Sequence, residues 1–276
     1  MTNNYLSHNF KNLIKVALDN KNKFNENKPF PHIIFDNFFN SKYLDLILEN
    51  FPELEKNKNV VEFNSEKDKK KFATNKNFNY PEIINNFLNY LNSFEFLNFL
   101  QIVTGIKETL ISDPYFFGGG LHEIKKNGFL KIHSDFNYHP DLYLDRRINI
   151  LIYLNKNWQE SYGGELELWN KSMEKSEKKI LPIFNRLVIF NTNDFTFHGH
   201  PEPLNCPENM SRKSIALYYY SNGRPDQEIN RKLRFHNTIY KNRKNFNEKI
   251  DERIPVYKKI FGKFYIRKKI NIDKFD

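Results

Sequence analysis

The stretch RINILIYLN, residues 147–155, shows the character of the region that decides the fold. It is short and rich in β-branched and aromatic residues, which is typical of a β-strand. Seven further segments of this kind surround it: YFFGGGLHEI (115–124), GFLKIHS (128–134), GELELWN (164–170), KKILPIF (178–184), RLVIFN (186–191), FTFHGH (195–200) and KSIALYYYS (213–221). The part of the chain from residue 112 to about residue 222 is therefore predicted to be built of strands.

Turn-forming residues separate these segments. Gly163-Gly164, Asn170 and Asn193-Asp194 stand between consecutive candidate strands, where glycine, asparagine and aspartate favour turns. Many short strands in about 110 residues favour an antiparallel sandwich or barrel. We therefore expect a mainly β fold with flanking helices, of the α+β class.

The flanking regions have a different pattern. Apolar residues have helical spacing in residues 9–20 and 41–52, and again from Pro81 to about Ile106, and Ser41 is a plausible helix N-cap. PHIIFDNFF (31–39) is interpreted as a short strand, the polar residues 56–78 as an exposed loop, and the last fifty residues as helical and basic.

These patterns predict one main domain and an extension. The domain covers residues 1–230, with helical support in residues 1–110 and a β core in residues 111–224, and a basic extension covers residues 231–276. A chain of 276 residues is long enough to bury a sizeable core in this way.

The composition indicates a soluble protein of a reducing compartment. Hydrophobic residues make up 39% of the chain, and no apolar run approaches the roughly 20 residues of a membrane-spanning helix. The N-terminus lacks the basic-then-apolar layout of a secretory signal, and Cys206 is the single cysteine. We therefore expect a cytoplasmic location.

The positive charge is concentrated at the C-terminus. Residues 231–276 hold 15 lysines and arginines against 5 acidic residues, whereas the preceding 230 residues hold 28 of each. A basic segment can bind nucleic acid or an anionic membrane surface, and a solvated tail without a partner has the same charge pattern. The charge pattern leaves both interpretations open.

His133-Ser134-Asp135 is an H-x-D triplet at the end of a predicted strand. Residues i and i+2 of a strand point to the same side, so the imidazole and the carboxylate can converge. His198 lies 65 residues further on, in another predicted strand. Two histidines and a carboxylate leave open positions on a metal, as in the facial triad of non-haem Fe(II) oxygenases.

Other residues compete for a place in this site. His200 shares the strand parity of His198, so periodicity alone cannot choose between the two. His139 is interpreted as a loop residue, and Asp141 and Asp194 as turn or capping residues. The alternative interpretation of the triplet is a surface histidine near a solvated aspartate, with no metal-binding role.

Two residues indicate a carboxylate ligand beside the metal. Arg212 begins the strand RKSIALYYY, and a guanidinium can hold a carboxylate with two parallel hydrogen bonds. Tyr153 offers a hydroxyl to the same group. Because side chains alternate along a strand, Asn149 and Arg147 share the face of Tyr153, and we predict that they bind the substrate. Arg147 pairing with a local acid such as Asp145 is the alternative.

At this point the chain resembles a known family. From about Gly118 to Pro225, some 40% of its length, it is similar to the prolyl-4-hydroxylase-like branch of the 2-oxoglutarate/Fe(II) dioxygenases. The segments that carry the resemblance are LKIHSDFN (130–137), RRINILIYLNKNW (146–158), YGGELELWN (162–170), PIFNRLVIFNT (182–192), FTFHGHPEPL (195–204) and SRKSIALYYY (211–220). The family fold is a double-stranded β-helix, or jelly roll, with supporting helices.

The resemblance implies a cofactor set and roles for residues. His133, Asp135 and His198 would bind Fe(II), because the family places the distal ligand directly before Gly199. Arg212 with Tyr153 would bind the distal carboxylate of 2-oxoglutarate, and His122 falls near a co-substrate tyrosine of some relatives. The reaction would consume O2, release succinate and CO2, and be stimulated by ascorbate.

The resemblance leaves the substrate open. A prolyl residue in a protein, an amino acid and a glycan are all compatible with this fold, because fold alone does not define function. The carboxylate of Asp135 favours hydroxylation, since halogenating members of the family have a small residue there. A non-catalytic jelly-roll binding module is the alternative class, and it would need no metal triad.

Overall fold

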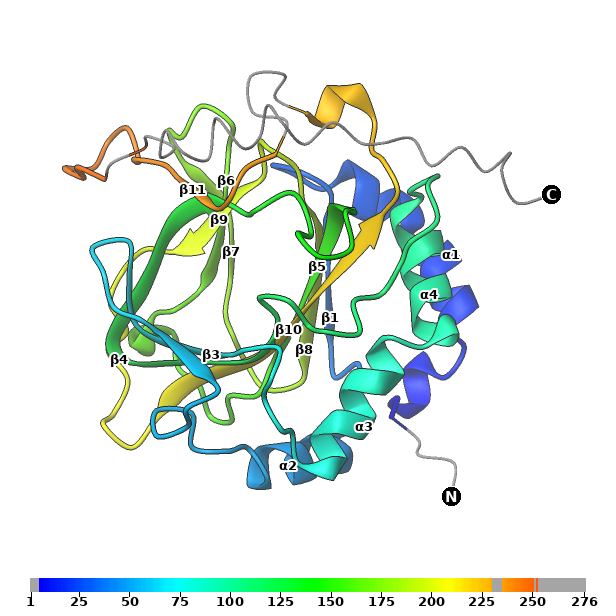
Figure 1. Ribbon diagram of the computed structural model, residues 1–276, viewed down its shortest axis with the longest axis horizontal. Coiled ribbons are helices and arrows are strands. Elements are labelled where there is room, and N and C mark those ends of the chain that lie inside the picture. Colours follow the sequence, from blue (N-terminus) through cyan, green and yellow to red (C-terminus); the bar gives the residue numbers. More distant parts are fainter. Residues whose placement is uncertain (1–4, 230–234, 251, 253–276) are drawn as a thin grey trace.

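The computed structural model describes residues 5–229, 235–250 and 252. Within them the α-helices all precede residue 105 and flank a curled sheet on one side (Figure 1). The helices are η1 (His8–Phe10), α1 (Leu13–Glu26), α2 (Ser41–Glu49), α3 (Glu82–Leu91), α4 (Phe94–Thr104), η2 (Glu160–Tyr162) and η3 (Asp226–Glu228). The strands are β1 (His32–Asp36), β2 (Val60–Phe63), β3 (Asp68–Thr74), β4 (Gly120–Ser134), β5 (Asp145–Tyr153), β6 (Leu166–Trp169), β7 (Ser176–Ile180), β8 (Arg186–Asn191), β9 (Phe197–His200), β10 (Ser211–Ser221) and β11 (Ile239–Tyr240).

Side-chain caps define where several helices start. The side chain of Asn12 accepts a hydrogen bond from the Lys15 amide at the start of α1, and that of Ser93 caps α4 in the same way. The cap of α2 is Asn40, whose side chain accepts from the Lys42 amide, and not Ser41 as predicted. Ser41 is instead the first helical residue. Both residue types cap well, so the sequence could not decide between neighbours.

The strands form one antiparallel sheet that curls round on itself. Its order is β1-β8-β5-β10-β4-β9-β6-β7, so strands distant in sequence pair side by side (Figure 1). β10, for example, lies between β5 and β4, which come earlier in the chain. This topology confirms the expected mainly β, jelly-roll core with supporting helices.

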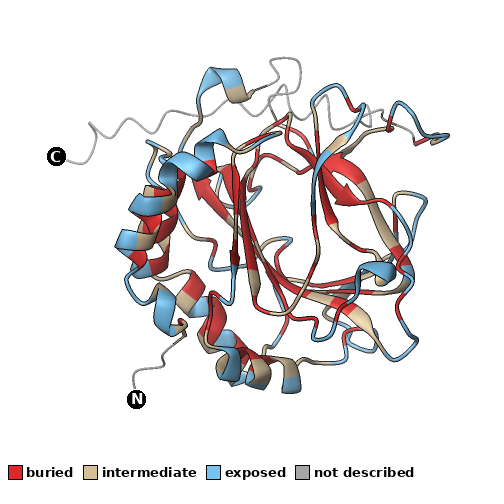
Figure 2. Ribbon diagram, turned by 180° about the vertical axis from the view of Figure 1, so that it is seen from behind, coloured by how far each residue is buried: buried red, intermediate tan, exposed pale blue. Residues whose placement is uncertain are grey.

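The alternating side chains of β5 show how the core is divided into two layers. Ile148, Ile150 and Ile152 are fully buried in the apolar cluster that includes the helices, whereas Tyr153 belongs to a second cluster inside the curled sheet. Leu151 packs against this second cluster. Buried residues therefore line both faces of the sheet. Much of the length of the central strands is coloured as buried in Figure 2. The inner face is the one that carries polar site residues.

The interpretation of residues 56–78 as an exposed loop was wrong. They contain β2 and β3, which pair with each other, and β3 continues the sheet by pairing with β4. The sequence hid these strands because residues 56–78 as a whole are mostly Lys, Glu and Asn, which are depleted in strands. Pairing with β4 nevertheless buries Phe72 and Thr74.

The expected helical character of the C-terminal extension is also wrong for its described part. Residues 235–250 contain no helix and instead include β11, which pairs with the end of β4. Ile239 lies opposite Ser134, and Tyr240 lies opposite His133. The basic residues 253–276 lie outside the described residues. In the described part of the chain, no helix combines the length and apolarity that crossing a bilayer requires.

Asn185 joins the segment after β1 to the strand-rich core. Its backbone lies at φ 60°, and the residue is 1% exposed. Its backbone amide donates a hydrogen bond to the Tyr153 carbonyl. Its side chain accepts a hydrogen bond from the Phe39 amide (2.9 Å) and donates one to the Phe39 carbonyl (2.8 Å). The amide side chain thus replaces a backbone pair between two distant segments.

We predict that Asn185→Ala lowers the free energy of unfolding by about 2–4 kcal/mol, because it removes two buried hydrogen bonds and disfavours a positive φ. Asn185→Gly is the matched control, since it loses the same bonds but tolerates the backbone angle. It should fall between the wild type and the alanine variant in urea unfolding. Equal stability of all three would contradict this role.

Candidate metal and co-substrate site

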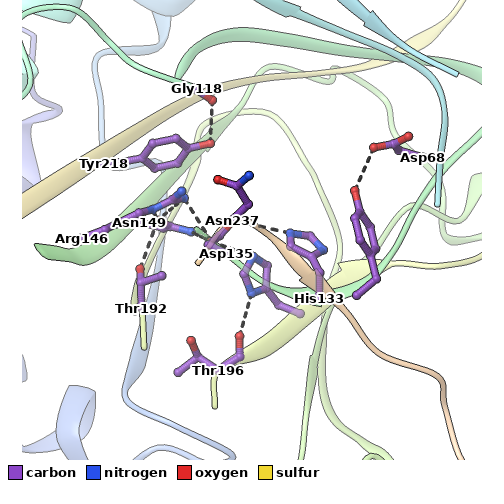
Figure 3. Close-up of polar contacts among 12 residues, drawn as sticks. Asp68, Gly118, His133, Asp135, Arg146, Asn149, Thr192, Thr196, Tyr218 and Asn237 are labelled. Atoms are coloured by element: carbon purple, nitrogen blue, oxygen red, sulfur yellow. Dashed lines mark hydrogen bonds and ion pairs between the residues drawn. The ribbon is translucent and has the colours of Figure 1, made fainter. Parts of the chain in front are cut away.

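Three side chains converge where β4 and β9 pair. His133 is the penultimate residue of β4, Asp135 lies just beyond the strand, and His198 on β9 lies directly opposite His133 in the register. One ligand atom from each residue lies within 4.8 Å of the other two, and all three residues are buried. Oδ1 of Asp135 is 3.6 Å from Nε2 of His133, and Oδ2 is 3.3 Å from Nε2 of His198. Figure 3 shows Asp135 beside His133.

Backbone carbonyls orient both imidazoles. Nδ1 of His133 lies 2.8 Å from the Lys131 carbonyl, and Nδ1 of His198 lies 3.1 Å from the Thr196 carbonyl. A carbonyl can only accept, so in each ring Nδ1 carries a proton and Nε2 is the nitrogen left to bind a metal ion. Nε2 of both rings lies near the Asp135 carboxylate, as a shared set of metal ligands requires.

A buried cation supports Asp135 from behind. Nη2 of Arg146 lies 3.1 Å from Oδ2 of Asp135, and the side chain of Asn149 donates to the same oxygen at 2.7 Å. The Arg146 guanidinium also donates twice to Asn149 and lies against the ring of Tyr218 (Figure 3). It lies over the ring of Phe136 as well. These contacts fix the carboxylate in one orientation.

The electrostatics prepare the three residues for a cation. Burial alone would raise the pKa of Asp135, but the charge of Arg146 and contacts with the two imidazoles outweigh it and hold that pKa well below its usual value. Burial, followed by the nearby His198, lowers the pKa of His133. The set therefore offers one carboxylate and two imidazole nitrogens, and this donor chemistry suits Fe(II) with further coordination positions open.

Arg212 and Tyr153 meet on the same inner face of the sheet. Nη2 of Arg212 donates to the Tyr153 hydroxyl (3.1 Å), and Nε donates to the Gly164 carbonyl (2.8 Å). Gly164 lies at φ 77°, and a Cβ there would meet Leu204 at 2.5 Å and Arg212 at 3.1 Å. The Gly163-Gly164 turn is therefore what allows the guanidinium to pack in this position.

Two further polar residues share this inner face. His122 lies opposite Ser214 of β10, which in turn lies opposite Tyr153. Lys71 of β3 lies opposite Ile124, the residue that pairs with Arg212. Burial and the charge of Lys71 lower the pKa of His122 to about 3. Lys71 was not predicted to be near the site, because residues 56–78 were interpreted as an exposed loop.

The structure does not bring Arg147 to the site. Its guanidinium binds Glu108 (2.8 Å) and Ser221 (2.9 Å) on the other side of β5. The register explains this, because Ile148 pairs with Tyr219 but Arg146 pairs with Tyr220, so Arg147 is an extra residue in a bulge. The bulge shifts the alternation of side chains by one residue. Arg146 therefore points to the inner face, where strict alternation predicted Arg147.

The competing residues of the sequence analysis have other positions. His200 is buried on the same strand as His198 but is not part of the converging group. Nδ1 of His139 accepts from the backbone amides of Asp141 and Leu142, which makes it a loop-stabilising residue. Asp194 is hydrogen-bonded to the side chain of Asn137 and lies 2.9 Å from His236.

Residues 237–240 of the C-terminal segment lie beside the metal ligands, which the sequence pattern did not predict. The ring of Tyr240 on β11 lies 5.5 Å from that of His133, and its hydroxyl donates to Asp68 of β3 at 2.8 Å. Asn237, from the same segment, lies beside His133 and Asp135 (Figure 3). Nothing in the sequence pattern linked residues 235–240 to the triplet, because strand pairing between distant segments leaves no local signal.

Comparison with known proteins agrees with this geometry. Residues 119–220, which include His133, Asp135, His198, Arg212 and Tyr153, match the family described as the 2OG-Fe(II) oxygenase superfamily. Residues 119–220 form a 2OG-Fe(II) oxygenase domain. Iron and 2-oxoglutarate are the cofactors of that superfamily, and the donor set described above fits them.

Individual relatives of this oxygenase domain include prolyl hydroxylases. A mouse prolyl 3-hydroxylase, OGFOD1, is 34% identical over 86 residues, which are 30% of this chain and 15% of the mouse protein. A Trichoplax adhaerens prolyl hydroxylase bound to a peptide of hypoxia inducible factor has a TM-score of 0.57 at 18% identity, over 77% of this chain and 92% of that one. A Pseudomonas putida prolyl-4-hydroxylase has a TM-score of 0.54 at 14% identity, and the match covers 76% of this chain and 100% of that one. The two structures show a shared fold.

The lowered pKa of His122 predicts how the metal-free protein responds to acid. Below the ordinary value of 6.5 the unfolded chain takes up a proton at this imidazole and the folded chain does not, so stability falls as the pH drops. In His122→Asn the loss of unfolding free energy between pH 7 and pH 5 should shrink by about 2 kcal/mol.

The matched control for that measurement is His8→Asn, because His8 is exposed. Urea unfolding at both pH values should show an unchanged difference for the control. If His122→Asn lost as much stability between the two pH values as the wild type, the lowered pKa of His122 would be contradicted.

Proposed function

We propose that this protein is a hydroxylase that depends on Fe(II), 2-oxoglutarate and O2 and acts on a prolyl residue of a protein. The observation that carries the proposal is the convergence of His133, Asp135 and His198 on the same inner face as the Arg212–Tyr153 pair. Iron(II) with 2-oxoglutarate supplies oxidation of a C–H bond by O2, with succinate and CO2 as by-products. Ascorbate is expected to stimulate turnover.

The protein residues have separate tasks in this proposal. His133, Asp135 and His198 hold the metal through two nitrogens and one oxygen and leave the other positions to ligands. Arg146 and Asn149 keep the Asp135 carboxylate from rotating, since both bind its Oδ2. Preorganised groups of this kind need no rearrangement during the reaction.

Arg212 and Tyr153 are the proposed clamp for the distal carboxylate of 2-oxoglutarate. Arg212 uses Nε for the Gly164 carbonyl, which fixes the plane of the guanidinium, and a carboxylate fits the fork of its N–H groups. The charge of Arg212 also favours the bound anion in a region where it is 5% exposed. The Tyr153 hydroxyl accepts from Arg212, and its own proton is then available to the carboxylate.

Two observations favour a prolyl substrate over an amino acid or a glycan. The names of the mouse and Trichoplax relatives specify prolyl hydroxylation, and the latter protein was solved with a peptide. Close to Asp135, the rings of Phe136 and Tyr218 flank Arg146, and aromatic faces with a neighbouring donor suit an apolar ring beside a peptide carbonyl.

Asp135→Ala should abolish metal-dependent succinate release, because the metal loses its only carboxylate ligand. Asp141→Ala is the matched control, since it removes an exposed loop carboxylate close in sequence and should leave release intact. The assay compares proline-containing peptides with the same peptides carrying alanine in place of proline. Full activity of Asp135→Ala would rule out the metal assignment, and equal activity on both peptide sets would rule out prolyl specificity.

Arg212→Ala should raise the 2-oxoglutarate concentration at half-maximal rate by about a hundredfold, as expected for loss of a charge-assisted, bidentate contact. The metal affinity should change little, because Arg212 is not among the metal-ligating residues. Titrations of succinate release against 2-oxoglutarate and against Fe(II) measure the two effects separately. An unchanged 2-oxoglutarate requirement would disprove the clamp.

A further inference from the structure

His200 is a buried histidine that the roles above leave unexplained. It is 3% exposed, and neither ring nitrogen has a hydrogen-bond partner in the described part of the chain. The other buried histidines of the described residues each have at least one: His32, His133, His139, His198 and His236 all contact backbone groups through Nδ1. A buried imidazole without a partner costs free energy, so natural proteins rarely keep one without a ligand.

The strand register places His200 between the metal ligands and Arg212. Along β4, His133 pairs with His198, Leu130 pairs with His200, and Ile124 pairs with Arg212. Residues 198 and 200 share a parity, so the His200 ring lies on the inner face, as do the metal ligands. His200 therefore lies along the stretch of the inner face that a dicarboxylic acid held by both the metal and Arg212 would occupy.

The electrostatic surroundings of His200 are those of an anion site. Ile124 of β4 lies between Arg212 of β10 and Lys71 of β3 in the register, so two cations reach the inner face on which His200 lies. An imidazole carries at least one ring N–H in either protonation state, so His200 can donate a hydrogen bond to an anion held there.

We propose that His200 donates a hydrogen bond to the distal carboxylate of bound 2-oxoglutarate, beside Arg212 and Tyr153. The proposal rests on the proposed function, since it needs that co-substrate. It makes His200 a binding residue that selects for a keto acid with a second carboxylate. The unpartnered nitrogen of the free protein then finds its acceptor only when the co-substrate is bound.

A ligand-binding role and a structural role of His200 predict opposite effects of an apolar replacement. If His200 serves the co-substrate, His200→Val leaves the metal-free protein at least as stable, because an unpartnered polar ring is removed. It also weakens 2-oxoglutarate binding by about ten- to a hundredfold, the usual effect of losing a buried hydrogen bond to a charged group. If His200 is structural, stability falls and binding is unchanged.

Calorimetric titration of 2-oxoglutarate into the Mn(II)-loaded protein tests this without turnover. The panel is the wild type, His200→Val and His200→Gln, in which a side-chain N–H remains and affinity should stay within a few fold. Mn(II) affinity should be the same in all three. Titration with 2-oxopentanoate, which lacks the distal carboxylate, should show no difference between the wild type and His200→Val.

The outcomes separate this inference from the function on which it rests. A wild type that binds Mn(II) but not 2-oxoglutarate overturns the proposed function, and the His200 role with it. A wild type that binds 2-oxoglutarate no more tightly than His200→Val overturns the His200 role alone. A His200→Val protein that fails to fold also overturns it, because the ring would then be structural.

Discussion

The antiparallel register of β4 and β9 is the constraint on which the site depends. It places His133 directly opposite His198, with Asp135 just beyond the end of β4. A slip of one residue would turn either imidazole to the other face of the sheet. Ile132 of β4 and Phe197 of β9 pack in one apolar cluster next to the two histidines, so this packing supports the geometry of the metal ligands.

Burial of polar groups gives this site its chemical character. Asp135, Arg146 and the imidazoles are all nearly inaccessible to solvent, which would be costly without the contacts among them. Arg146 keeps Asp135 ionised, and burial keeps His133 neutral. The contacts that hold the Asp135 carboxylate ionised therefore also prepare it to bind a cation.

The sequence was sufficient for the β core and for the residues that local patterns define. Alternating β-branched segments marked the strands, and the H-x-D spacing identified His133 and Asp135. The choice of His198 over His200 depended on family resemblance, because the two residues share a strand parity. Arg212 and Tyr153 could be named for the same reason, but their contact is a result of the sheet topology.

The errors have physical causes in non-local structure. A bulge opposite Tyr219 and Tyr220 exchanged the positions of Arg146 and Arg147, and a one-residue insertion of this kind leaves no trace in the periodicity. Lys71 was missed because its strand is polar and gains its stability from pairing with β4. Tyr240 was missed because β11 is too short for a pattern and is defined only by its partner strand.

The central claim is that one metal ion and one 2-oxoglutarate share the inner face of this sheet. The most direct measurement is a crystal structure of the protein with Mn(II) and 2-oxoglutarate, with anomalous scattering used to locate the metal. The account predicts one anomalous peak bounded by His133, Asp135 and His198, with the distal carboxylate of the ligand against Arg212. A peak at other residues, or a ligand bound away from Arg212, would contradict it.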